Sequence, residues 1–136
     1  MIKLIVGTKG TGKTKILIDM MEKSERESNG SVVCIDKGSK LRFTANHTIR
    51  LIDIEDYGIS GHETFAGFIL GVLAENYDIT DIFIDSLIKI VGRDLDKLEN
   101  FFAGINNHAK DVNIVFTVSA DLSELPENVK KLAITN

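Results

Sequence analysis

The chain has 136 residues, of which 43% are hydrophobic and 26% charged, and its formal net charge is −4. These proportions are typical of an ordinary globular protein, and the length suits one domain, which we expect to span residues 1–136. The acidic balance argues against broad DNA or RNA binding, because that function usually requires a basic face.

Membrane insertion and secretion are also not expected. The longest apolar stretch without a charge, residues 65–74, is too short to cross a bilayer. The first residues lack the length and flanks of a signal peptide. Cys34 is the only cysteine, so no intramolecular disulfide can form, which fits a reducing compartment. We therefore expect a cytoplasmic protein in which Cys34 is a small core residue.

The opening stretch predicts a phosphate-binding loop between a strand and a helix. Ile2–Val6 is an apolar run of strand length, and the next eight residues fit the pattern G-x-x-x-x-G-K-[ST] in full. These are Gly7, Thr8, Lys9, Gly10, Thr11, Gly12, Lys13 and Thr14. A strand before and a helix after are the context in which such a loop binds nucleotide. The alternative is a glycine-rich turn without a ligand.

Each residue type in this loop has a chemical reason. Glycines adopt backbone angles closed to other residues, and they keep side chains away from the ligand. Backbone N–H groups and the helix start can then surround phosphate oxygens. We expect Lys13 to contact the β- and γ-phosphates and the Thr14 hydroxyl to bind Mg²⁺.

The next two elements are a helix over residues 12–26 and a strand over residues 31–36. Apolar residues recur in the helix at steps of three and four. The strand, SVVCID, is predicted to be buried and parallel to the first, because a helix joins the two. Asp36 lies at its carboxyl end, which is the edge where open α/β sheets bind ligands.

Residues 38–57 are harder to assign. Leu41–Thr44 and Thr48–Ile54 alternate weakly between apolar and polar residues, which predicts a β-excursion, with a hairpin as one arrangement. His47 lies between them in a polar turn. We expect it to be solvated, because no second metal-type residue follows at ligand spacing.

A second long helix is predicted from Ser60 to about Asn76. Ser60 and Glu63 have the spacing of a capping box, which closes a helix start with two side-chain bonds to backbone N–H groups. Gly67 and Gly71 share one face of this helix. We expect tight packing on the sheet there, with a homodimer contact as the alternative.

The remaining elements complete an alternating α/β pattern. Asp81–Asp85 and Val112–Val118 are predicted strands, and residues 92–94 open the helix between them. Pro126 suits the first turn of a short helix, and Leu132–Thr135 is a candidate edge strand.

Asp85 ends an apolar strand and is the expected carboxylate for Mg²⁺, acting through the water shell of the metal. The alternative is an aspartate that caps the following segment. Thr117 and Ser119 end the fourth strand with hydroxyl groups at the same edge of the sheet.

Together these segments resemble the P-loop NTPases, and within that superfamily the chain is similar to the RecA-like branch. The resemblance is carried by Gly7–Thr14, Val33–Asp36, Ile82–Leu87 and Asn113–Ser119. It implies an α/β fold of three layers, in which helices cover both faces of a mostly parallel central sheet. It also implies ATP and Mg²⁺ at the carboxyl edge of the sheet, and often an oligomer.

The resemblance assigns roles by position. Lys13 carries over as a phosphate ligand, and Thr14 and Asp85 carry over as metal ligands. Thr117 or Ser119 carries over as the sensor of the γ-phosphate. Lys13, Asp85 and Ser119 are therefore the expected catalytic residues.

Two positions depart from the family pattern. Ser86 follows Asp85 where many relatives have a glutamate that orients the attacking water. Residues 37–39 (KGS) occupy the place after the second strand where RecA-like proteins carry that glutamate. Asp36 and Glu63 are the nearest acidic residues that could orient the water, but neither matches the family motif. The sequence therefore predicts nucleotide binding, while hydrolysis lacks an identified water-orienting residue.

Three functions remain open at this point. The first is a slow Mg²⁺-dependent ATPase that acts on or with a protein partner or another copy of itself. The second is a non-hydrolysing module whose partner binding depends on nucleotide. The third and least favoured is a small-molecule kinase, because kinases usually carry an arginine-rich lid and this chain has four arginines.

Overall fold

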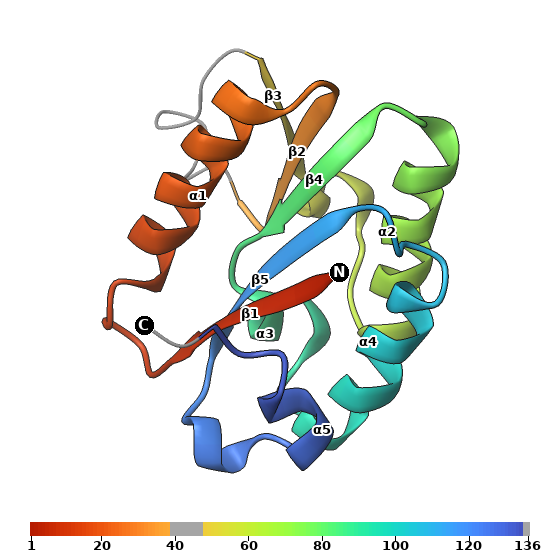
Figure 1. Ribbon diagram of the computed structural model, residues 1–136. Helices are drawn as coiled ribbons and strands as arrows, with labels where there is room; N and C mark the ends of the chain where they lie inside the picture. The colour runs from red at the N-terminus through yellow and green to blue at the C-terminus, as the bar shows by residue number, and fades with distance from the viewer. Residues whose placement is uncertain (39–47, 135–136) are drawn as a thin grey trace.

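The computed structural model describes residues 1–38 and 48–134. Five strands form one sheet in the spatial order β1-β5-β4-β2-β3, and all neighbouring pairs are parallel. The strands are β1 Ile2–Gly7, β2 Ser31–Asp36, β3 Ile49–Asp53, β4 Ile79–Ile84 and β5 Asn113–Ser119. Helices cover both faces of this sheet (Figure 1). The predicted fold class, three-layer α/β/α with a parallel central sheet, is confirmed.

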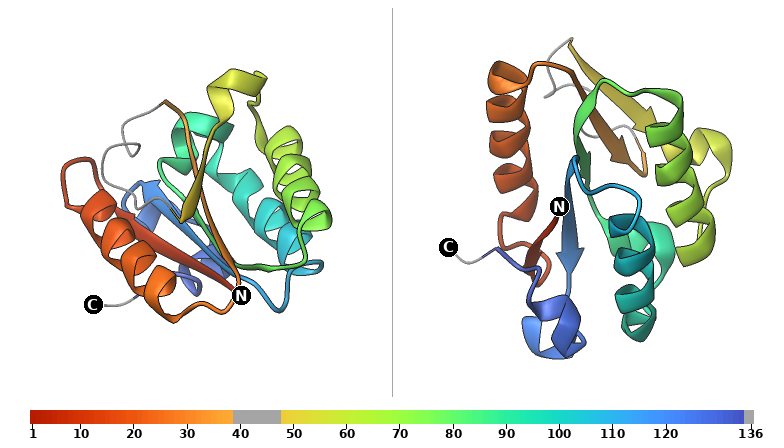
Figure 2. Two further views of the ribbon diagram at one scale, coloured as in Figure 1. Left: turned by 90° about the horizontal axis from the view of Figure 1, so that it is seen from above. Right: turned by 45° about the vertical axis from the view of Figure 1, so that its right-hand side comes forward.

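The helices divide unequally between the two faces (Figure 2). The helix α1 (Lys13–Glu27) packs on one face. On the other face lie α2 (His62–Glu75), α3 (Leu87–Val91) and α4 (Leu98–Asn106). The shorter elements are η1 Ile54–Tyr57, η2 Leu95–Lys97, η3 Leu122–Glu124 and α5 Glu127–Lys130. None of the helices in the described ranges is both long and apolar enough to cross a membrane.

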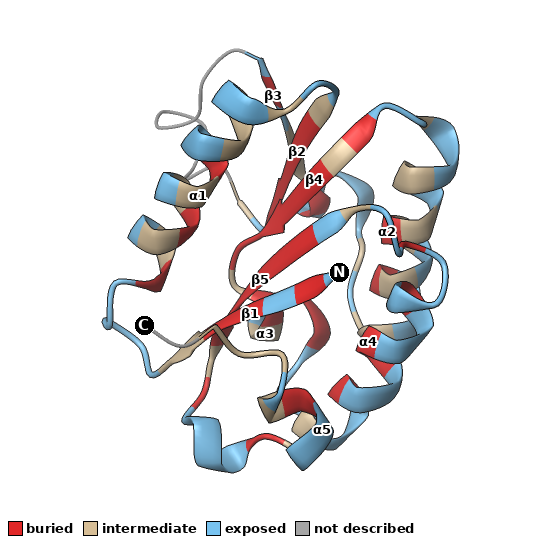
Figure 3. Cartoon of the chain, in the orientation of Figure 1, coloured by how far each residue is buried: buried red, intermediate tan, exposed pale blue. Residues whose placement is uncertain are grey.

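Strands buried on both faces explain the continuous apolar runs in the sequence (Figure 3). In β2, Cys34 packs with Leu17 and Met21 of α1. The alternate residues Val33 and Ile35 belong to the core on the opposite face. Because successive side chains of a strand point to opposite faces, residues of even number in β2 are directed toward α1.

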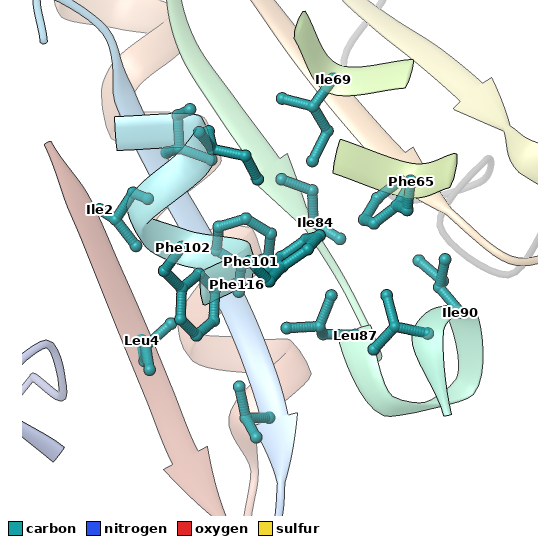
Figure 4. Packing of buried hydrophobic residues seen from close by; sticks show 14 of the residues in the cluster. Ile2, Leu4, Phe65, Ile69, Ile84, Leu87, Ile90, Phe101, Phe102 and Phe116 are labelled. Carbon is teal, nitrogen blue, oxygen red and sulfur yellow. The ribbon is translucent and has the colours of Figure 1, made fainter. Parts of the chain in front are cut away.

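The larger core contains a cluster of aromatic rings (Figure 4). The ring centroids of Phe101 and Phe102 of α4 are 5.2 Å apart, and those of Phe102 and Phe116 of β5 are 5.1 Å apart. Phe65 of α2 lies 6.1 Å from Phe101. Edge-to-face and stacked contacts of this kind add stabilisation beyond simple burial. The cluster holds α2 and α4 against β5.

The predicted capping box at Ser60 is wrong. The helix α2 begins at His62, its N-cap is Gly61 with φ of 88°, and no side chain among residues 1–38 and 48–134 makes a cap bond. The Gly61 N–H instead donates to the Ile90 carbonyl at 3.1 Å. A tertiary contact with α3, a helix that the sequence did not predict, therefore sets where α2 starts.

The expected close approach at Gly67 and Gly71 is also wrong within this chain. Both residues are exposed, and a Cβ built on either would meet no atom within 4 Å. The apolar residues Phe65 and Ile69 face the core instead. The homodimer alternative stays a prediction.

The three remaining segments predicted as possible strands have different outcomes. The segment predicted over Thr48–Ile54 contains β3, an edge strand parallel to β2. Leu41–Thr44 and His47 lie outside the described residues. The last edge strand appears as one parallel bridge between Leu4 and Ala133. Two backbone bonds hold that bridge, from the Leu4 N–H to the Leu132 carbonyl and from the Ile134 N–H to the Leu4 carbonyl.

Candidate functional site

The loop between β1 and α1 folds closely on itself. Gly7 ends β1, and a Cβ there would lie 2.6 Å from Thr11 Oγ1. Gly12 is the N-cap of α1 with φ of 83°, in the left-handed region that favours glycine. Among the described residues, no side chain caps this helix start. The first N–H groups of α1 and their partial positive charge therefore remain directed at the loop.

Lys13 places its ammonium group inside this loop. Its Nζ donates to the Thr8 carbonyl at 2.8 Å, and Thr11 Oγ1 donates to the same oxygen at 2.7 Å. Lys13 is only 8% exposed. Burial lowers the pKa of Lys13, while the negative charge of Asp85 acts in the opposite direction. A buried cation beside uncapped N–H groups is an arrangement suited to an anionic ligand.

Thr14 and Asp85 meet although 71 positions separate them. The Thr14 hydroxyl donates toward the Asp85 carboxylate, at 3.2 Å from Oδ2 and 3.4 Å from Oδ1. Asp85 follows β4 directly and is 1% exposed. Its N–H donates to the Ile35 carbonyl of β2 at 3.1 Å. The two side chains therefore lie in contact, while their role as metal ligands stays a prediction.

The two residues fit what Mg²⁺ requires from a protein. Mg²⁺ commonly uses one or two protein oxygens and completes its shell with water and substrate phosphates. Within the described ranges, no group of three or more acidic, histidine or cysteine side chains is arranged to hold a metal. A cation between Thr14 and Asp85 would thus depend on a phosphate ligand in the adjacent loop.

Thr117 of β5 fixes the orientation of Asp85. Its hydroxyl donates to Asp85 Oδ1 at 2.6 Å and accepts from the Ser86 N–H at 2.7 Å. Thr117 is 1% exposed, so both bonds form away from water. Ser86 has φ of 60° and ψ of 52°, the left-handed region that is unfavourable for residues other than glycine. Strain of this kind often accompanies functional sites.

Ser119 lies in the same edge of β5, two residues beyond Thr117. It is in register with Gly7 of the loop, and its carbonyl accepts from Arg93 Nη1 at 3.1 Å. The sequence left Thr117 and Ser119 as alternative phosphate sensors. The geometry gives Thr117 a contact with Asp85, while a sensor role for Ser119 stays a prediction.

Of the two acidic candidates for orienting water, Asp36 lies beside Asp85. Ile35 of β2 pairs with Ile84 of β4, so the residues that follow them are neighbours at the carboxyl edge. Asp36 is 5% exposed, and its Oδ1 accepts from the Lys37 N–H at 2.8 Å. Glu63 is exposed and lines a different cavity, with Arg93 and other residues of α2 to α4.

A cavity of about 400 Å³ opens beside the loop. Its lining includes Gly7, Thr8 and Lys13 of the loop, Asp121 and Leu122 after β5, and Ile134. Leu122 and Ile134 are lining residues that were not predicted from the sequence. No local pattern marks them, because they reach the loop only through the position of β5 and the return of the chain along β1.

Comparison with known proteins gives a structural match only. No protein-family model matches the chain, and no curated protein sequence matches it. A solved structure, the flagellar accessory protein FlaH from Methanocaldococcus jannaschii, superposes with a TM-score of 0.61 and 20% sequence identity. The match covers 96% of this chain and 65% of that chain. It shows a shared fold, while membership of the RecA-like branch stays a prediction.

Proposed function

We propose that this protein binds a nucleoside triphosphate, ATP by resemblance, with Mg²⁺ at the loop between β1 and α1. The contact between the Thr14 hydroxyl and the Asp85 carboxylate carries this proposal. It joins the glycine loop to the acidic end of β4, as nucleotide binding with a metal requires. When bound, Mg²⁺ neutralises charge on the β- and γ-phosphates.

We propose the following roles for the residues of the site. The α1 start and Lys13 bind phosphate oxygens, and Lys13 stabilises charge that develops on the γ-phosphate. Thr14 and Asp85 hold the metal, and Thr117 keeps the Asp85 carboxylate in place. Hydrolysis further needs a group that orients water, and we propose Asp36 for this step.

We propose slow hydrolysis, coupled to a protein partner or a second copy, as the activity. Ser86 stands where many relatives have a glutamate, which supports a low rate. The same observation favours the second candidate, a module that binds nucleotide without hydrolysing it and changes its partner binding instead.

Phosphate release from Mg·ATP by the wild type, Lys13→Ala and Lys23→Ala tests the proposal. Lys23 is an exposed lysine of α1 outside the phosphate loop and serves as the matched control. We expect Lys13→Ala to reduce the rate about 100-fold, while Lys23→Ala stays near the wild type. Tight ATP binding with no turnover above Lys13→Ala would instead support the non-hydrolysing module. Transfer of phosphate to a nucleoside would indicate a kinase.

The role of Asp36 has its own comparison. We expect Asp36→Asn to lower the turnover number while the affinity for ATP stays unchanged, since the proposed role concerns water rather than nucleotide. Glu63→Gln is the control, because Glu63 lines a different cavity. Equal turnover in Asp36→Asn and the wild type would remove Asp36 from the mechanism.

A further inference from the structure

Two different surroundings adjoin the phosphate loop. The Thr14 hydroxyl faces the Asp85 carboxylate. Thr8 and Lys13 line the cavity of about 400 Å³. Of the described residues, neither Thr14 nor Asp85 lines that cavity. A ligand in the loop would therefore adjoin both the proposed metal ligands and a separate cavity.

This difference in surroundings suggests how a bound nucleotide is oriented in the loop. A lysine and a hydroxyl residue at these motif positions hold the β- and γ-phosphates and the metal. The terminal phosphates would thus lie toward Thr14 and Asp85. The cavity, which shares Thr8 and Lys13 with the loop and is not lined by Thr14 or Asp85, offers space for the rest of the molecule. Its volume falls in the range of ligand pockets in proteins.

The apolar residues of the cavity lining beyond β1 come from three separate segments. Ile16 belongs to α1, Leu122 to η3, and Ile134 follows α5. The segment that carries Ile134 returns beside β1 (Figure 1) and is held there by backbone bonds with Leu4. Leu122 is 46% exposed, so its side chain is accessible to a ligand in the cavity. Such a surface suits the flat faces of a ring system.

Asp121 adds one acceptor to this lining. Its Oδ1 accepts from the Ser123 N–H and from Ser123 Oγ, each at 3.0 Å. These two bonds lower the pKa of Asp121, so the carboxylate is ionised at neutral pH. Both bonds end on Oδ1, so they leave the lone pairs of Oδ2 for another donor. A carboxylate repels phosphates, so its partner here is a neutral donor.

We propose that this cavity is the nucleoside subsite, in which Leu122 and Ile134 pack against the base. Asp121 Oδ2 accepts a hydrogen bond from a nucleoside donor, either a ribose hydroxyl or the exocyclic amine of the base. The inference rests on the proposed nucleotide binding and adds to it the part of the ligand that distinguishes a nucleotide from a bare polyphosphate.

The test measures the affinities of Mg·ATP and magnesium tripolyphosphate by titration calorimetry. Asp121→Asn keeps the Oδ1 acceptor for Ser123, and Leu122 is half exposed, so both Asp121→Asn and Leu122→Ala are expected to fold. We expect Asp121→Asn to weaken ATP binding roughly tenfold and Leu122→Ala to weaken it roughly fivefold. Neither variant should weaken tripolyphosphate binding. Glu127→Gln, an exposed acid on α5 outside the cavity, is the control and should leave both affinities unchanged.

Two nucleotide analogues separate the possible donors. If the ribose is the donor, the effect of Asp121→Asn disappears with 2′,3′-dideoxy-ATP. If the amine is the donor, the effect disappears with inosine triphosphate. An unchanged ratio of ATP to tripolyphosphate affinity in both Asp121→Asn and Leu122→Ala overturns the subsite alone. A wild type that binds neither ligand overturns the proposed function, and the subsite with it.

Discussion

At the scale of single residues, the proposed metal site depends on a buried carboxylate held between two hydroxyls. Asp85 receives one hydrogen bond from Thr14 of α1 and one from Thr117 of β5. A carboxylate buried in this way needs such bonds, because leaving it without them costs more free energy than each bond contributes. Thr117 is therefore a positioning residue that acts through Asp85.

Replacing Thr117 tests that role. Thr117→Val keeps the shape but removes both bonds, so we expect the free energy of unfolding to fall by about 1–3 kcal/mol. We also expect the gain in ATP affinity on adding Mg²⁺ to shrink about tenfold, while ATP binding without Mg²⁺ stays the same. Thr117→Ser retains the hydroxyl and is the control. Equal Mg²⁺ dependence in the valine variant and the wild type would contradict the positioning role.

Cys34 carries a second effect at this scale. Burial, followed by the negative charges of Asp36 and Asp85, raises the pKa of the Cys34 thiol from 9.0 to about 12. The folded state thus keeps a proton that the unfolded state loses above pH 9. Since the unfolded state then binds fewer protons, stability falls as pH rises.

The Cys34→Ala variant has no thiol, so comparing it with the wild type isolates the contribution of the thiol titration. We expect the free energy of unfolding of the wild type, relative to Cys34→Ala, to fall between pH 9 and pH 12, by up to about 1.4 kcal/mol per pH unit. Denaturant unfolding of both proteins across this range measures the difference. A constant difference would mean that the thiol ionises equally in both states.

At the level of helices and strands, a glycine in a tight connection and a glycine on an exposed helix face have opposite effects on stability. Gly30 joins α1 to β2, and a Cβ there would lie 2.0 Å from the Asp78 carbonyl oxygen before β4. Gly71 sits in the middle of α2, where a Cβ meets no atom within 4 Å. Packing therefore requires a glycine at position 30. At position 71 the glycine lowers helix stability, and no described contact in the monomer requires it.

The two alanine variants should therefore change stability in opposite directions. We expect Gly30→Ala to lower the free energy of unfolding by about 1–3 kcal/mol through overpacking. We expect Gly71→Ala to raise it by about 0.5–1 kcal/mol, because alanine is the better helix former. Denaturant titrations at several protein concentrations provide the measurement. If Gly71→Ala destabilises in a concentration-dependent way, the exposed face of α2 is covered by a second copy.

At the scale of the whole molecule, the strand order assembles the proposed site. β5 lies between β1 and β4, so Thr117 reaches Asp85 and the residues after β5 reach the phosphate loop. The loop after β1 leads directly into α1, so Thr14 in the first turn of α1 lies at the same edge. Residues far apart in the sequence meet there because the carboxyl ends of parallel strands share one edge.

Ligand binding at that edge should stabilise the entire fold. At a Mg·ATP concentration 100 times the dissociation constant, we expect the free energy of unfolding to rise by about 2.7 kcal/mol. Lys13→Ala should show little of this gain, and chelation of Mg²⁺ should remove much of it in the wild type. Thermal unfolding with and without nucleotide reports the change. An equal gain in Lys13→Ala would place the binding site elsewhere.

The sequence alone determined the features that depend on neighbouring residues. The glycine loop, the apolar strands and the position of Asp85 at a strand end all follow from local pattern and from backbone chemistry. The boundaries of β2 agree with the prediction residue for residue. These features are readable because steric limits and side-chain alternation act over only a few positions.

Tertiary structure decided what depends on contacts between distant segments. It gave Thr117 its contact with Asp85, made Asp36 a neighbour of that residue, and brought Ile134 to the phosphate loop. It also made Gly61, instead of Ser60, the N-cap of α2 and left Gly67 exposed. Strand order and helix placement control these outcomes, and they follow from how the entire core packs rather than from any local pattern.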